Sequence, residues 1–115
     1  MPEVTAEHLK HFEKQCIYWR EKFGLRDWRL YVRQRDSFDG EAHAWADIKI
    51  DDLIAKIYIA KEWFEPITEE SLNSTALHEI LHVVLRPLVS LITDDCEQIE
   101  HAIIHRLCHA MLGVA

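Results

Sequence analysis

Cysteine is scarce in this sequence, and no two cysteines are placed to act together. The three that are present, Cys16, Cys96 and Cys108, are an odd number and form no C-x-x-C pair. A disulfide framework uses cysteines in pairs, and a thiolate zinc site uses closely spaced ones. We therefore expect neither of these, and a reducing cytoplasm is the natural compartment.

Long hydrophobic runs are absent as well. No stretch approaches the roughly 18 to 20 uninterrupted apolar residues that a membrane span needs. Residues 1–4 lack the basic end and the apolar core of a secretory signal. We therefore expect neither export nor a membrane partner.

Positive charge is also in short supply. The 115 residues include 13 Lys and Arg against 20 Asp and Glu, a net charge of −7 at pH 7. A broad nucleic-acid-binding face needs clustered basic residues. The only basic cluster, Arg26, Arg29, Arg33 and Arg35, alternates with apolar residues and is interpreted as the solvated face of a strand. The sequence thus predicts no direct contact with nucleic acid.

What is present is the composition of a globular protein. Hydrophobic residues make up 49% of the chain and charged residues 29%. There is no internal repeat, linker or low-complexity segment. Residues 1–115 are therefore expected to form a single domain, with the oligomeric state left open.

Apolar periodicity predicts three helices. Apolar residues three and four apart follow Thr5, a good N-cap, and stop at Gly24. A second helix is expected over residues 68–85, because Pro87 disfavours a helix beyond the residue before it. A last helix is expected over residues 94–113, after a start that resembles a capping box.

Strand signals lie between the first two helices. Alternation over residues 28–33 and the turn formers at 36–40 indicate a strand and a hairpin-like turn. Two further strands, antiparallel, are expected within 42–50 and 55–60. The fold class is therefore α+β, with an N-terminal helix, a three- or four-stranded mainly antiparallel sheet and two C-terminal helices.

The second helix carries the pattern H-E-x-x-H as His78, Glu79 and His82. Two histidines four apart lie one turn from each other and present their rings to one metal ion, and the glutamate beside them is placed as a general base. The rest of this helix is mostly apolar, so it should be buried. Its polar residues fall within one arc of roughly 100° and are Ser71, Thr75, His78, Glu79, His82 and Arg86.

The last helix offers a third ligand. Glu100 projects from the middle of an apolar face formed by Cys96, Ile99, Ile103, Ile104, Leu107, Ala110 and Met111. A buried carboxylate needs a partner, and a zinc ion shared with the second helix would supply one. Glu97 lies at the edge of this face and is the rival ligand. His101, His105 and His109 lie on the opposite side and are interpreted as a solvated face rather than a second metal site.

These residues resemble the gluzincin metallopeptidases, the group that includes thermolysin. The resemblance covers residues 78–107 in motif and most of the chain in the order of its elements. The nearest likeness is to compact prokaryotic and phage-associated versions, in which Leu-His-Glu-Ile-Leu-His-Val (77–83) precedes a helix bearing Glu-His-Ala-Ile-Ile (100–104). The resemblance implies a small zincin-like fold, with His78, His82 and Glu100 as Zn²⁺ ligands and Glu79 as general base.

The implied activity is hydrolysis of peptide bonds in a peptide or protein substrate, with zinc activating a water molecule. Arg86, His43 and Tyr58 are candidate donors to the oxyanion, and a structural role is the favoured interpretation of each. Residues 42–46 are the candidate edge strand that would hold an extended substrate. The alternative is a catalytically weak or inactive zinc-binding interaction module on the same fold. The presence of Glu79 favours catalysis, because a purely structural site does not need it.

Overall fold

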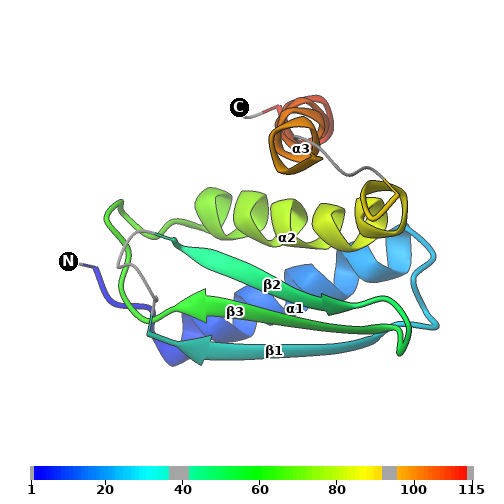
Figure 1. The fold of residues 1–115 in the computed structure, drawn as a ribbon. Coiled ribbons are helices and arrows are strands. Elements are labelled where there is room, and N and C mark those ends of the chain that lie inside the picture. The colour runs from blue at the N-terminus through cyan, green and yellow to red at the C-terminus, as the bar shows by residue number, and fades with distance from the viewer. Residues whose placement is uncertain (1, 37–41, 92–95, 114–115) are drawn as a thin grey trace.

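A computed structural model describes residues 2–36, 42–91 and 96–113. Three helices and a three-stranded mixed sheet make up an α+β fold (Figure 1). In chain order the elements are α1 (Ala6–Lys22), β1 (Arg29–Arg35), β2 (Ala44–Lys49), β3 (Ile54–Ala60), α2 (Glu69–Val89) and α3 (Cys96–Leu112). None of the helices in the described part of the chain is long and apolar enough to cross a membrane.

The sheet has the strand order β1-β3-β2. Strands β2 and β3 are antiparallel, as the sequence predicts, but β1 pairs with β3 in parallel. The expected hairpin after β1 and the mainly antiparallel sheet are therefore wrong, and the predicted turn itself falls partly on residues 37–41, outside the described residues. The physical reason lies in β3, whose Ala55, Ile57 and Ile59 are fully buried. The most apolar strand takes the central position, where it is covered on both edges.

Helix α1 begins and ends as predicted. The Thr5 side chain accepts a hydrogen bond from the His8 N–H, and the His8 ring accepts one from the Thr5 N–H, which completes a capping box. The C-cap is Phe23, and Gly24 follows with φ of +70°, a conformation that glycine adopts without strain.

Helix α2 begins after Thr68 but continues past its predicted end. Pro87 lies inside the helix, which runs on to Val89. Proline removes the hydrogen bond that its own nitrogen would donate and crowds the carbonyl four residues earlier, but the residues after it can still form helical hydrogen bonds. The Ser90 N–H donates to the Arg86 carbonyl and the Ser90 hydroxyl donates to the Pro87 carbonyl, so the last turn is closed. The expected end before Pro87 is therefore wrong by one turn.

The core lies between one face of the sheet and helices α1 and α2. Phe12 and Cys16 of α1 meet Val32 and Ile57 of the sheet and a row of buried residues from α2. That row comprises Leu72, Ala76, Leu77, Ile80 and Leu81. Helix α2 is thus buried on most of its surface, as predicted. Helix α3 packs against α2 on the side away from β1 (Figure 1).

Candidate metal centre

Helix α2 brings His78, Glu79 and His82 to one place. The ring centroids of His78 and His82 are 5.0 Å apart. His82 is 9% exposed and Glu79 is 5% exposed, while His78 is half-buried. Because α2 is surrounded by core on its other sides, these are the polar groups that it presents toward α3. The one-turn spacing of the motif therefore brings the two histidine rings close together, as the sequence predicts.

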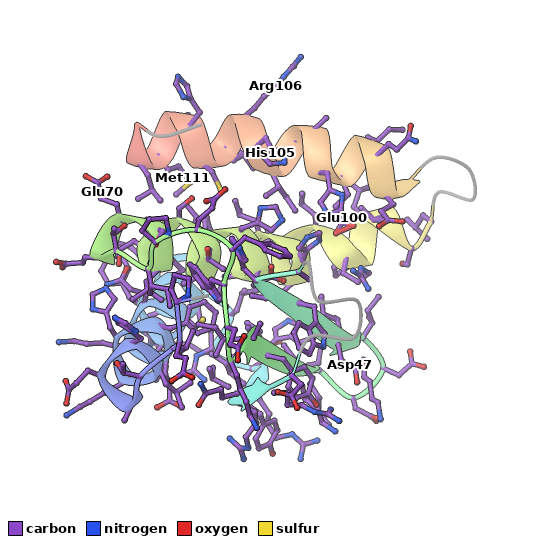
Figure 2. The ribbon with its side chains drawn as sticks, turned by 90° about the vertical axis from the view of Figure 1, so that its left-hand side faces the viewer. Asp47, Glu70, Glu100, His105, Arg106 and Met111 are labelled. Carbon is purple, nitrogen blue, oxygen red and sulfur yellow. The ribbon has the colours of Figure 1, made fainter. Side chains whose placement is uncertain are left out.

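Helix α3 contributes Glu100, which is 3% exposed. Its Oε1 atom is 2.7 Å from Nδ1 of His82, and Figure 2 shows it in the space between the two helices. The Arg86 Nη2 atom is 3.8 Å from the same oxygen. In the tautomer in which Nδ1 donates to this carboxylate, Nε2 of His82 keeps the lone pair that a metal requires.

His101 joins this cluster, contrary to the solvated face that the sequence predicts for it. Its ring centroid is 5.0 Å from that of His82 and 5.7 Å from that of His78. One ligand atom from each of His78, His82 and His101 lies within 4.8 Å of the others. His105 is exposed, but its ring is 5.5 Å from that of His78, whereas His109 is exposed without a described ring contact.

The misplacement of His101 comes from the orientation of α3. The predicted apolar face includes Ile99, Ile103 and Met111, yet these side chains are 45%, 39% and 40% exposed. Glu100 and Ile104 of that face are buried as predicted, and Cys108 is buried with them at the same four-residue interval. The helix is thus turned about its axis relative to the prediction, and His101 moves to the edge of the buried face. The four-residue spacing of Glu100, Ile104 and Cys108 is the feature of the sequence that indicates this orientation of α3.

Burial lowers the basicity of the histidines. The pKa of His78 falls to about 4, because the ring is desolvated and lies near His82, His101 and His105. Burial also lowers the pKa of His82, against the opposing effect of its hydrogen bond to Glu100. Both rings are therefore neutral at pH 7, the form in which imidazole binds a metal ion.

Glu79 has the opposite shift. Burial, with a smaller effect of the Glu100 charge, raises its pKa to about 8. Its carboxyl group is therefore held close to the neutral form in the metal-free protein. A divalent cation beside it would favour the ionised form, because opposite charge at short range stabilises a carboxylate.

A cavity of about 590 Å³ opens onto this cluster. Ala44 and Ala46 of β2 line one side of it, and His78, Glu79 and His82 line another. Glu97, the rival ligand, also lines the cavity but is exposed. Strand β2 lies at the edge of the sheet and pairs with β3 alone among the described strands. An edge strand with the short side chains of Ala44 and Ala46 therefore borders the cavity.

The three candidate oxyanion donors lie in different places. Arg86 lines the cavity, beside Glu100. His43 stacks on Trp63 at a centroid distance of 4.4 Å and borders a smaller cavity, of about 260 Å³, that also reaches His78 and Glu79. Tyr58 stacks against Trp45 and lines neither cavity. Arg86 and His43 are therefore within the site region, whereas Tyr58 is not.

The donor set suits a zinc ion. Three imidazoles and nearby carboxylates are the nitrogen and oxygen ligands that zinc takes at tetrahedral sites. Cys16 and Cys108 are both free, and burial raises the pKa of each thiol, so neither is poised as a thiolate ligand.

Comparisons of the chain with protein-family profiles, with curated proteins and with solved structures give no match.

Proposed function

We propose that this protein is a zinc-dependent hydrolase that cleaves peptide bonds, with Glu79 as the general base. One observation carries the proposal: the two motif histidines and the buried Glu79 line the same cavity as the polar residues of α3. A structural zinc site is closed by its ligands, whereas a catalytic site keeps an open position beside a base. The cavity supports the open kind of site.

For the metal ligands we infer His78, His82 and His101. The mutual proximity of their ligand atoms supports this set. Glu100 then acts behind His82, because its carboxylate accepts the Nδ1 proton and fixes the orientation of the ring. The sequence instead predicts Glu100 itself as the third ligand. Both assignments place the third metal ligand on α3, and variants of the two residues distinguish them.

When bound, zinc would supply Lewis acidity and bring the pKa of a water molecule toward 7. With the metal in place, Glu79 would be ionised and could accept a proton from the attacking water and pass it to the leaving amine. Arg86 lines the cavity and is the donor in position to stabilise developing negative charge.

The edge position of β2 supports a peptide as the substrate class. An extended chain can add to a sheet edge through backbone hydrogen bonds. Ala44 and Ala46 of this strand line the cavity, and their short side chains leave room beside His78 and Glu79. The free thiols of Cys16 and Cys108 support a reducing, cytoplasmic setting.

The test compares Glu79→Gln with Glu97→Gln, the same chemical change on the exposed part of the same cavity. Cleavage of quenched fluorescent casein and of a fluorogenic peptide mixture is measured with one equivalent of zinc. Glu79→Gln should keep its zinc and its melting temperature but lose at least about 100-fold in rate. Glu97→Gln should retain the rate of the unsubstituted protein.

Two results would contradict the proposal. Equal cleavage by Glu79→Gln and the unsubstituted protein would remove the general base. Absence of cleavage by the zinc-loaded, folded protein would leave the catalytically weak or inactive zinc-binding module, the alternative that the sequence also allows.

A further inference from the structure

The outer face of the sheet, on the side opposite α1 and α2, carries charged and aromatic side chains. Side chains alternate between the two faces of a strand. On β1 the inward residues include the buried Val32, while Arg29, Tyr31, Arg33 and Arg35 are exposed. These four outward residues form a row about 20 Å long.

The register of the sheet extends this row across all three strands. Tyr31 is paired with Lys56, and Arg33 is paired with Tyr58. On β2, Trp45 is paired with Tyr58, and Asp47 with Lys56. Directly paired residues share a face. The outer sheet face is therefore defined by Arg29, Tyr31, Arg33, Arg35, Trp45, Asp47, Lys49, Lys56 and Tyr58.

This face is basic on a chain whose net charge is −7. Five of its residues are Lys or Arg, and Asp47 is its one acidic member. Within the described ranges, none of these five cations forms an ion pair with a side-chain carboxylate. By contrast, Arg26 pairs with Glu21 at 3.0 Å and lies outside the face. Among the described residues, the outer sheet face thus gathers positive charge that no ion pair neutralises.

Aromatic rings are interleaved with these cations. The Arg33 guanidinium lies 5.8 Å from the Tyr31 ring, and that of Arg35 lies 5.0 Å from the Tyr58 ring. Tyr58 and Trp45 stack with centroids 5.5 Å apart and an interplanar angle of 27°. Tyr31, Arg33, Lys56 and Tyr58 surround a shallow hollow of about 250 Å³. The rings are held in place by their neighbours, which reduces the entropy lost when a ligand stacks on them.

We propose that the outer sheet face binds single-stranded nucleic acid, contrary to the expectation from the sequence, which interprets Arg29, Arg33 and Arg35 only as a solvated face. Aromatic side chains on an open sheet stack on unpaired bases, and the surrounding Lys and Arg contact the phosphates. A duplex hides its bases from such rings, and an acidic peptide has no bases to stack, so both use only the charges. The combination of rings and cations therefore favours the single strand.

Among the described residues, this surface meets the metal-site cavity only at Trp45, which lines that cavity with Ala44 and Ala46. The hollow on the outer face is formed instead by Tyr31, Arg33, Lys56 and Tyr58, none of which lines the metal-site cavity. The binding function therefore does not depend on the proposed hydrolysis. Treatment with a chelator, or the Glu79→Gln change, should leave the affinity for nucleic acid unchanged, which separates a failure of one proposal from a failure of the other.

The experiment measures fluorescence anisotropy of a labelled oligothymidylate of about 15 nucleotides between about 50 and 200 mM salt. Binding should be saturable and should weaken as salt rises. The double variant Arg33→Gln, Arg35→Gln should reduce the slope of log affinity against log salt by about 1.4, because each lost phosphate contact contributes about 0.7. Tyr58→Leu and Tyr31→Leu keep apolar bulk but remove the ring, and each should raise the Kd about fivefold or more.

The matched control is Lys14→Gln, Arg106→Gln, which removes two exposed positive charges from α1 and α3. Figure 2 shows Arg106 directed away from the rest of the protein. This control should leave the salt slope unchanged, and melting curves should show that every variant is folded. The proposal is overturned if the oligonucleotide does not bind, or if polyglutamate, heparin or a duplex binds as tightly as the single strand. It is also overturned if both Tyr→Leu variants bind like the unsubstituted protein.

Discussion

Glu79 and His78 are neighbours in the chain, yet burial shifts their pKa values in opposite directions. The two shifts therefore change the stability of the protein with pH in opposite ways. The pKa of His78 is lowered to about 4 from 6.5, and that of Glu79 is raised to about 8 from 4.5. The unfolded chain takes up a proton at His78 before the folded protein does, so stability falls as pH drops from 6.5 toward 4. The folded protein holds the Glu79 proton more tightly, so stability falls as pH rises from 4.5 toward 8.

The first prediction follows for the metal-free protein. The two effects offset each other between about pH 4.5 and 6.5, so chelator-treated protein should be most stable there. Between pH 6.5 and 8 it should lose about 2 kcal/mol through Glu79. Saturating zinc should remove this loss, because the cation favours the ionised carboxylate. Urea unfolding across this pH range, with zinc and with chelator, measures both curves, and parallel curves would contradict the prediction.

The second prediction separates the candidate ligands. His101→Gln should lower zinc affinity by more than Glu100→Gln, since the first removes a ligand and the second removes the group that orients His82. The second loss should be about 10- to 100-fold. Glu97→Gln should bind zinc as the unsubstituted protein does, because Glu97 is exposed at the cavity.

Competition with a chromophoric chelator gives these affinities. If Glu100→Gln loses more affinity than His101→Gln, then Glu100 is the third ligand that the sequence predicts and His101 is secondary. If Glu97→Gln has the largest effect, both assignments fail.

At the scale of single elements, Pro87 gives the third prediction. It lies inside α2, so the carbonyl of Val83, a buried residue, lacks the hydrogen bond that a residue with an N–H at this position would donate. Pro87→Ala should restore that bond and raise the free energy of unfolding by about 1 to 2 kcal/mol, after subtracting the greater entropy of the unfolded alanine chain. Urea denaturation measures the change, and a decrease would show that the proline ring makes a stabilising contact.

Local patterns in the sequence predict where most elements lie, although α2 continues past its predicted end. The Thr5 cap and the alternating strands act within a few residues, and the structure confirms both. The partner of β1 is not a local property. Whether β1 pairs with β3 or with β2 depends on which of these two strands buries more apolar surface at the centre of the sheet. The turn formers after β1 contain no information on this.

The candidate site was predictable to the same extent. The spacing of His78 and His82 on one helix ensures their proximity, whatever packs against them. The contribution of α3 depends on how that helix is turned against α2, which is a tertiary property. The sequence predicts Glu100 and Ile104 on the buried face, and the structure confirms both, but Ile99 and Ile103 of the same predicted face are exposed and His101 lies beside His82.

On the scale of the whole molecule, α3 depends on α2 for its attachment. Helices α1 and α2 share the main core with the sheet, whereas α3 adds chiefly Ile104 and Cys108 to it. The polar cluster of His82, Glu100 and His101 lies in the same interface. A metal ion bound by residues of both helices would therefore join α3 to the remainder of the protein.

The fourth prediction is a local response to metal. Removing zinc should increase amide hydrogen exchange in α3 while leaving α1 and β3 nearly unchanged, since opening of α3 need not disturb the main core. Hydrogen exchange with mass spectrometry, with and without chelator, measures this difference. His101→Gln should show the metal-free pattern even with zinc, and Lys14→Gln should not. Equal changes throughout the chain would indicate that zinc stabilises the fold as one unit.

The mixed sheet also has a consequence for the order of events in folding. Strands β2 and β3 are joined by a short turn and can pair while the rest of the chain is unfolded. Strand β1 must find β3 after the whole of β2 has been placed, which is a contact between distant parts of the chain. Docking of β1 should therefore be the late step. Substitutions in the β2–β3 hairpin would slow folding, and substitutions in β1 would chiefly speed unfolding.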